Sequence, residues 1–95
     1  MERVISSELS KQVGHKVLVK GWLNSLRIMG KLSFLVLRDR GGLVQIVIEN
    51  KSEIQKVKSL QPGSVLSVTG EVKSTNQTEV GIELINPKIT IESAV

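Results

Sequence analysis

Cysteine is absent from this 95-residue sequence, which excludes disulfide bonds and metal sites built on thiolates. Histidine occurs once, at His15, so no second histidine can complete a metal site, and we expect His15 to be structural or solvent-exposed. The nine acidic residues are scattered, and hydrolytic or transfer chemistry finds little support among them. The sequence therefore predicts no catalytic residue, no metal and no cofactor for this chain.

Long apolar segments are also absent. The longest runs, at residues 34–37 and 46–48, have the length of a strand, whereas a membrane helix needs roughly 20 apolar residues. Residues 1–5 show no signal-peptide pattern. Together with the missing cysteine, these features indicate a cytoplasmic protein without a membrane partner. The 40% hydrophobic content is that of a folded protein, and the length suits one domain over residues 1–95.

Positive charge is concentrated in one part of the chain. Residues 11–40 contain seven of the 13 basic residues and one acid, whereas residues 41–95 contain five basic and six acidic residues. The seven are Lys11, Lys16, Lys20, Arg27, Lys31, Arg38 and Arg40. This distribution indicates a polyanion such as nucleic acid as the partner, although ordinary solvated surfaces also carry such an excess. The acid, Asp39, is expected to hold its turn rather than to act as a base.

Five segments alternate between apolar and polar residues, with the period of a half-buried strand. They are residues 15–26, 32–38, 43–49, 64–73 and 81–92. Gly21 within the first segment predicts a bend or a bulge. Asn86-Pro87 within the last predicts an edge position or a bulge, because proline lacks the N–H of a strand ladder.

The period changes between the third and fourth of these segments. Apolar residues at every third position from 54 to 60, with charges between them, predict a short amphipathic helix over residues 52–60. Ser52 is its expected N-cap, and Pro62 ends it. We therefore predict an all-β fold, a five-stranded OB-fold barrel with one short helix between strands three and four. An SH3-like barrel, the competing fold, lacks a helix at that place.

Aromatic residues are few, one tryptophan and one phenylalanine. Single-stranded RNA is recognised by stacking its unpaired bases on aromatic rings and by hydrogen bonds to base edges. If Leu35 and Leu37 fill the barrel, Phe34 points outward; the alternative is that Phe34 belongs to the core. Trp22 is expected to pack across the barrel mouth rather than to stack on a base.

Gln45 is a polar residue within an apolar strand. It stands between Val44 and Ile46, so its side chain is predicted to point outward. A glutamine amide offers a donor and an acceptor side by side, which suits a base edge. Since strands two and three are adjacent, Phe34 and Gln45 would share one face. The alternative is that Gln45 is merely solvated.

The segment from residue 21 to residue 45 resembles the N-terminal domain of aspartyl-tRNA synthetases. It begins with Gly-Trp and ends with Leu-Arg-Asp-Arg-Gly-Gly-Leu-Val-Gln, its most specific part. Residues 68–72 and 81–91 look like the family's fourth and fifth strands, so the resemblance covers nearly the whole chain. Asparaginyl enzymes share the fold and the Gly-Trp start but usually depart at the second arginine and the glutamine, and lysyl enzymes differ further.

The resemblance implies recognition of the anticodon loop of an aspartate tRNA. Phe34 would stack on the central anticodon base, and Gln45 would hydrogen-bond the edge of that base. Arg27 would contact the loop backbone or a neighbouring base, and Glu83 would reach another anticodon base. Independently of the resemblance, the basic region over residues 11–40 predicts that Lys31 joins Arg27 in attracting the RNA electrostatically.

The class II aminoacylation core of that family has no counterpart in these residues. The chain would therefore bind RNA without catalysis, and an ATP-dependent aspartate–tRNA ligase reaction would belong to a parent protein. The chain is either an excised domain, with a class II catalytic domain elsewhere on its parent chain, or a free-standing relative.

Two other hypotheses stay open. One is a general single-strand-binding OB protein, for which two aromatic residues are few. The other is a protein-interaction OB domain, including an engineered binding scaffold. A neutral face on strands two and three would have favoured that second alternative.

Overall fold

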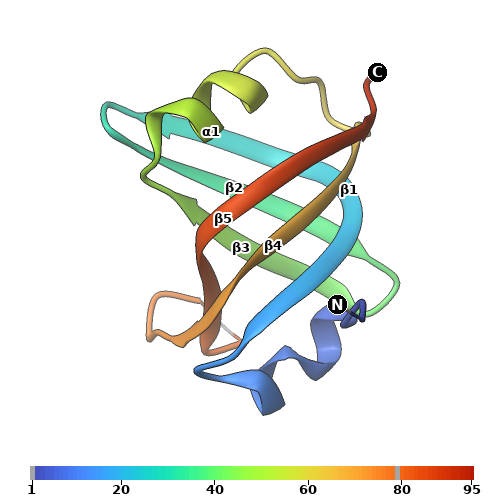
Figure 1. The fold of residues 1–95 in the computed structure, drawn as a ribbon, viewed down its shortest axis with the longest axis vertical. Helices are drawn as coiled ribbons and strands as arrows, with labels where there is room; N and C mark the ends of the chain where they lie inside the picture. The colour runs from blue at the N-terminus through green and yellow to red at the C-terminus, as the bar shows by residue number, and fades with distance from the viewer. Residues whose placement is uncertain (1, 79) are drawn as a thin grey trace.

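The computed structural model describes residues 2–78 and 80–95, which fold into a closed barrel of five strands (Figure 1). The strands are β1 (Lys16–Met29), β2 (Leu32–Asp39), β3 (Gly42–Ile48), β4 (Val65–Ser74) and β5 (Ile82–Ser93). An α-helix, α1 (Lys51–Val57), lies between β3 and β4, and a 3₁₀-helix, η1 (Ser6–Gln12), precedes β1. The predicted order, with one short helix between strands three and four, is confirmed.

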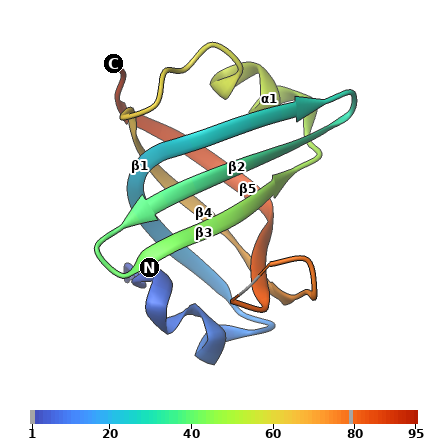
Figure 2. The same ribbon diagram turned by 180° about the vertical axis from the view of Figure 1, so that it is seen from behind.

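Around the barrel the strands follow the order β1-β2-β3-β5-β4, and β4 pairs with β1 to close it. β3 and β5 pair in parallel, and the other neighbours pair antiparallel. The two short connections after β1 and β2 make the first three strands the predicted meander. These three strands lie side by side on one face of the barrel (Figure 2).

β1 bends from one neighbour to the next at its middle. Residues 16–22 pair with β4, and residues 22–29 pair with β2. A Cβ atom added to Gly21 would lie 2.1 Å from the carbonyl oxygen of Arg38, so the close approach of the backbones requires glycine. The register also shifts between Leu23 and Ser25, which is a bulge. The predicted bend or bulge at this corner is confirmed.

The interruption of β5 at Asn86-Pro87 is also a bulge, which is one of the two predicted alternatives. Asn86 has a positive φ of 50°, and the register with β4 shifts between Thr69 and Glu71. The extra residue on β5 accommodates Pro87, which has no N–H to donate to a ladder.

One cluster of buried apolar side chains fills the barrel, with contributions from every strand and from both helices. Along β1 the buried residues include Val17, Val19 and Leu23, which alternate with more exposed ones. On β2, Leu35 and Leu37 have no exposed surface. Phe34 stands between inward-facing neighbours and is half-buried, so its predicted outward orientation is confirmed.

Helix α1 packs against one end of the barrel through Ile54 and Val57. Its N-cap is Asn50, whose side-chain oxygen accepts hydrogen bonds from the backbone N–H groups of Ser52 and Glu53 at 2.8 and 3.2 Å. The prediction of Ser52 as the N-cap was therefore wrong. The spacing of the apolar residues predicts only which side of the helix is buried. The first turn begins at Lys51, before the first apolar residue of that pattern.

A buried carboxylate joins α1 to β5. Glu53 accepts a hydrogen bond of 2.7 Å from the backbone N–H of Ile89, and it pairs with Lys56 at 2.9 Å. Lys56 in turn donates to the carbonyl oxygen of Ile89 at 3.0 Å. The two side chains therefore bind both backbone groups of one β5 residue and fix the helix on the barrel.

The segment before β1 is docked on the turn between β2 and β3. The buried carboxylate of Asp39 accepts hydrogen bonds from the Ser6 backbone N–H and hydroxyl at 2.8 and 2.6 Å, and from the Gly41 N–H at 2.8 Å. A Cβ atom at Gly41 would lie 2.4 Å from Ile5. The prediction that Asp39 holds its turn is confirmed, and Asp39 also anchors η1.

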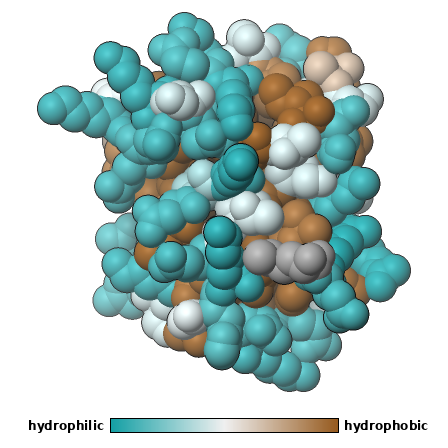
Figure 3. Space-filling view, in the orientation of Figure 1, coloured by the Kyte–Doolittle hydropathy of each residue, from teal (hydrophilic) through white to brown (hydrophobic). Residues whose placement is uncertain are grey.

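Polar side chains cover most of the surface seen in the orientation of Figure 1, and the hydrophobic ones form separate patches (Figure 3). Among the described residues, no helix is both long and apolar enough to cross a membrane.

Candidate nucleic-acid interface

The outward residues of β1, β2, β3 and the adjacent β5 form the surface on which four of the predicted site residues meet. Phe34 on β2 lies opposite Arg27 on β1, and Val36 lies opposite Gln45 on β3. β3 is next to β5, where Ile46 pairs with Leu84, so Gln45 and Glu83 are neighbours across those strands. The strand register alone therefore brings these side chains to one face.

The ring of Phe34 is covered by a cation. The guanidinium carbon of Arg27 lies 5.5 Å from the ring centroid, within the range of a cation–π contact. Arg27 is exposed, and Phe34 is half-buried. An aromatic face with a solvent-exposed cation above it can accept a planar base or orient an anion beside it.

The amide of Gln45 is oriented by Glu83. Its Nε2 donates to a carboxylate oxygen of Glu83 at 3.3 Å, and both residues are half-buried. One amide N–H is thereby used, and the carbonyl oxygen and the second N–H of Gln45 stay available to a ligand. The arrangement suits a base edge better than a phosphate, because the adjacent carboxylate repels anions.

Shallow hollows lie on both sides of Gln45. One of about 400 Å³ is lined by Ser25, Leu26, Arg27, Phe34, Val36 and Gln45. A second of about 360 Å³ is lined by Val36, Leu43, Gln45, Thr78 and Val80. Because the two share Val36 and Gln45, the surface can hold two planar groups side by side with the amide between them.

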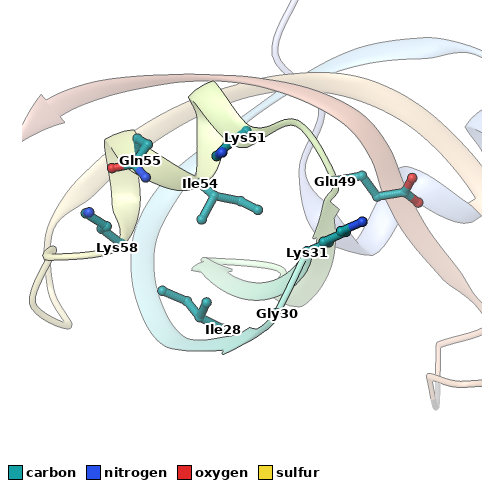
Figure 4. Close-up of a pocket in the computed structure, with 8 residues that line it drawn as sticks. All are labelled: Ile28, Gly30, Lys31, Glu49, Lys51, Ile54, Gln55 and Lys58. Carbon is teal, nitrogen blue, oxygen red and sulfur yellow. The ribbon is translucent and has the colours of Figure 1, made fainter.

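Lys31, the fifth predicted site residue, lies apart from the other four. It sits at the tip of the β1–β2 hairpin and lines a groove of about 440 Å³ against α1, where Ile28 and Ile54 point toward each other (Figure 4). Lys51 and Lys58 line the same groove. Sequence reasoning missed these two lysines, since charges between the apolar residues of a helix predict only a solvated surface.

Most of the predicted basic region is free of acidic partners. In residues 2–78 and 80–95 the ion pairs are Lys11 with Glu8 at 2.8 Å and Lys56 with Glu53. The hydrogen bond and charge of Glu8 raise the pKa of Lys11 above its ordinary value. Because the negative charge of Glu8 compensates that of Lys11, this lysine adds little to the positive field, whereas Arg27, Arg38 and the other basic residues of this region form no ion pair among the described residues.

Trp22 differs from its prediction. Its side chain is 43% exposed on the outer surface of β1, and the barrel interior at this corner belongs to Gly21 and Leu23. The expectation that it packs across the barrel mouth was therefore wrong. Within the described part of the chain, no three His, Cys, Asp or Glu side chains lie close enough to hold a metal ion.

A closed five-stranded barrel with a helix between its third and fourth strands is an OB-fold, a class of domain that binds oligonucleotides on strands two and three. A family model described as OB-fold nucleic acid binding domain matches residues 17–92, and the chain belongs to this family. It is an anticodon-binding OB domain like that of aspartyl- and asparaginyl-tRNA synthetases.

Three relatives illustrate the match. An aspartate–tRNA(Asp/Asn) ligase of Streptococcus mutans is 39% identical over 80 residues, which are 83% of this chain and 13% of the ligase. The structure of asparaginyl-tRNA synthetase from Pyrococcus horikoshii superposes with a TM-score of 0.90 at 31% identity, over 100% of this chain and 23% of that one. OBody AM3L09, bound to hen egg-white lysozyme, has a TM-score of 0.77 at 26% identity, over 90% of this chain and 88% of the OBody. The chain thus spans less than a quarter of the two synthetases.

Proposed function

We propose that this chain binds the anticodon loop of an aspartate tRNA, as the recognition domain of an aspartyl-tRNA synthetase. The observation that carries the proposal is the hollow bordered by Phe34, Arg27 and Gln45, with Glu83 hydrogen-bonded to Gln45. Recognition of single-stranded RNA uses a stacking surface, a cation and a donor–acceptor pair, and these residues supply all three.

Phe34 stacks on the central anticodon base after Arg27 moves aside. A cation–π contact at an exposed site contributes about 0.5–1 kcal/mol, whereas a stacked base contributes about 1–3 kcal/mol. The base therefore displaces the guanidinium from the ring. Arg27 is then free to bind a phosphate of the loop, and Lys31 attracts the backbone from the hairpin tip.

Gln45 and Glu83 read base edges. The carbonyl oxygen and second N–H of Gln45 face the central base, and the carboxylate of Glu83 accepts from an N–H of another anticodon base. Gln45 and Arg40 support the aspartate type, because the asparaginyl enzymes usually differ at these two positions of the motif.

Aminoacylation belongs to another part of the protein in this proposal. Residues 1–95 act as one binding unit in the cytoplasm, without catalytic groups, metal or cofactor. A class II catalytic domain on the parent chain carries out the ATP-dependent ligation of aspartate to the bound tRNA.

The test is the binding of anticodon stem-loops for the Asp, Asn and Lys tRNAs at one defined salt concentration. The Asp loop should bind tightest, and the Asn loop, whose anticodon differs from the Asp anticodon only in its third base, should be second. Equal affinity for these three loops and for a loop with another central base would leave a general single-strand-binding barrel. Absence of binding to every loop would favour a protein-interaction domain.

A further inference from the structure

The second aromatic residue lies on the same surface as the first. Trp22 pairs with Arg38 across β1 and β2. Phe34, Val36 and Arg38 alternate along β2 with the buried Leu35 and Leu37, so all three point outward. One outward row of β2 therefore leads from the Phe34 hollow to the side of Trp22.

The two rings are far enough apart to serve different nucleotides. Phe34 and Arg38 are four residues apart, which is roughly 13 Å along a strand. Successive nucleotides in a stacked strand are about 3.4 Å apart. A base on Phe34 therefore leaves room for one or more further nucleotides before the indole of Trp22.

The charges around Trp22 are mainly positive. Arg38 is exposed beside it, and Lys20 is exposed two residues earlier on the same side of β1. The guanidinium of Arg3 donates to the carbonyl oxygen of Lys20 at 3.0 Å. An acidic residue, Glu92, also lies nearby. Its carboxylate accepts a hydrogen bond from the hydroxyl of Ser67 on β4, and Ser67 pairs with Lys20 on β1. Three basic residues against one acid favour a polyanion over an apolar protein partner.

We propose that Trp22 is a second stacking platform for the RNA that occupies Phe34. A loop nucleotide next to the anticodon stacks on the indole, and Arg38 binds its phosphate. An exposed aromatic ring flanked by arginine is the combination that single-stranded nucleic-acid sites use. The proposal rests on the anticodon-binding function, because the second nucleotide is held only when the first base is on Phe34.

Trp22 is the only tryptophan of the chain, so the intrinsic fluorescence reports this position alone. The 95-residue chain is titrated with the Asp anticodon stem-loop carrying a dye at one end. Tryptophan emission and dye anisotropy are followed together. Stacking on the indole should quench the emission with the same midpoint as the anisotropy, and should protect the indole from acrylamide.

Trp22→Ala should weaken the stem-loop by roughly 5- to 140-fold, the loss of one stacked base, whereas Trp22→Phe should retain most of the affinity. Ile91→Ala is the matched control, since Ile91 is a comparably exposed apolar residue at 39%. It should leave binding unchanged.

The outcomes separate this proposal from the function on which it rests. The second platform would be overturned, and the anticodon site kept, by three results together: Phe34→Ala weakens stem-loop binding, the RNA leaves the tryptophan emission of the unmodified chain unchanged, and Trp22→Ala binds with the affinity of the unmodified chain. No rise in anisotropy with any stem-loop would overturn both. If Trp22→Ala does not fold, quenching and acrylamide protection of the unmodified chain decide the matter.

Discussion

Replacing Phe34 by alanine tests the centre of the proposed site. The change removes a stacking surface that contributes about 1–3 kcal/mol per base. In the free domain Arg27 covers this ring, and the contact that a base must break is about 0.5–1 kcal/mol. The alanine variant has no such contact to break, so its net loss of binding free energy lies between about 0 and 2.5 kcal/mol, which is at most roughly 60-fold in affinity.

The same change should affect stability only slightly. Phe34 is half-buried on the outer surface of β2, whereas its neighbours Ser33 and Leu35 face the interior and have no exposed surface. Truncation of a buried phenylalanine costs about 3–5 kcal/mol, whereas a half-exposed ring on a sheet surface should cost about 1 kcal/mol or less. Urea unfolding measures this difference.

Two further variants separate stacking from packing. Phe34→Tyr keeps an aromatic face and should bind nearly as well as the unmodified chain. Phe34→Leu keeps apolar volume without a π-face, and should bind nearly as weakly as Phe34→Ala. The assay is dye anisotropy with the Asp stem-loop at fixed salt. Wild-type affinity for Phe34→Leu, or a loss of unfolding free energy above about 3 kcal/mol for Phe34→Ala, would refute the reasoning.

Three other changes make separate predictions. Gln45→Ala should lower affinity for the Asp loop and change little for a loop with another central base, measured by anisotropy; equal losses for both would exclude edge recognition. Replacing Arg27 and Lys31 by glutamate should weaken all loops alike and reduce the slope of log affinity against log salt by about 1.4, from about 0.7 per lost phosphate contact; an unchanged slope contradicts this. Glu53→Ala leaves the Ile89 N–H unpaired and should lower the unfolding free energy by about 1–3 kcal/mol, whereas the exposed Glu49→Ala should not.

Alternation along strands accounts for most of what could be predicted. The alternation of inward and outward residues placed Phe34 and Gln45 on the outer face, because each stands between residues that face the barrel interior. The corner at Gly21 followed from a glycine within a strand pattern. These inferences need only local sequence, since a strand has a period of two and a barrel has one interior.

Long-range contacts account for what could not be predicted. The hydrogen bonds of Asp39 to Ser6 join residues 33 positions apart, and no periodicity reports them. Trp22 was misplaced because the tight corner leaves the interior to Gly21, and an apolar residue type suggested burial instead. The groove beside Lys31 forms only when α1 packs beside the β1–β2 hairpin.

The parallel pairing of β3 with β5 gives ligand binding a dynamic consequence. β2 and β3 pair in register from Ser33 to Asp39, whereas β3 and β5 pair through Ile46 and Leu84. A short ladder opens more readily than a long one, so this seam is a place for local opening of the barrel. The Gln45–Glu83 hydrogen bond spans the seam. RNA that binds both side chains would therefore hold β3 and β5 together. Amide hydrogen exchange at Ile46 and Leu84 should slow when the loop binds.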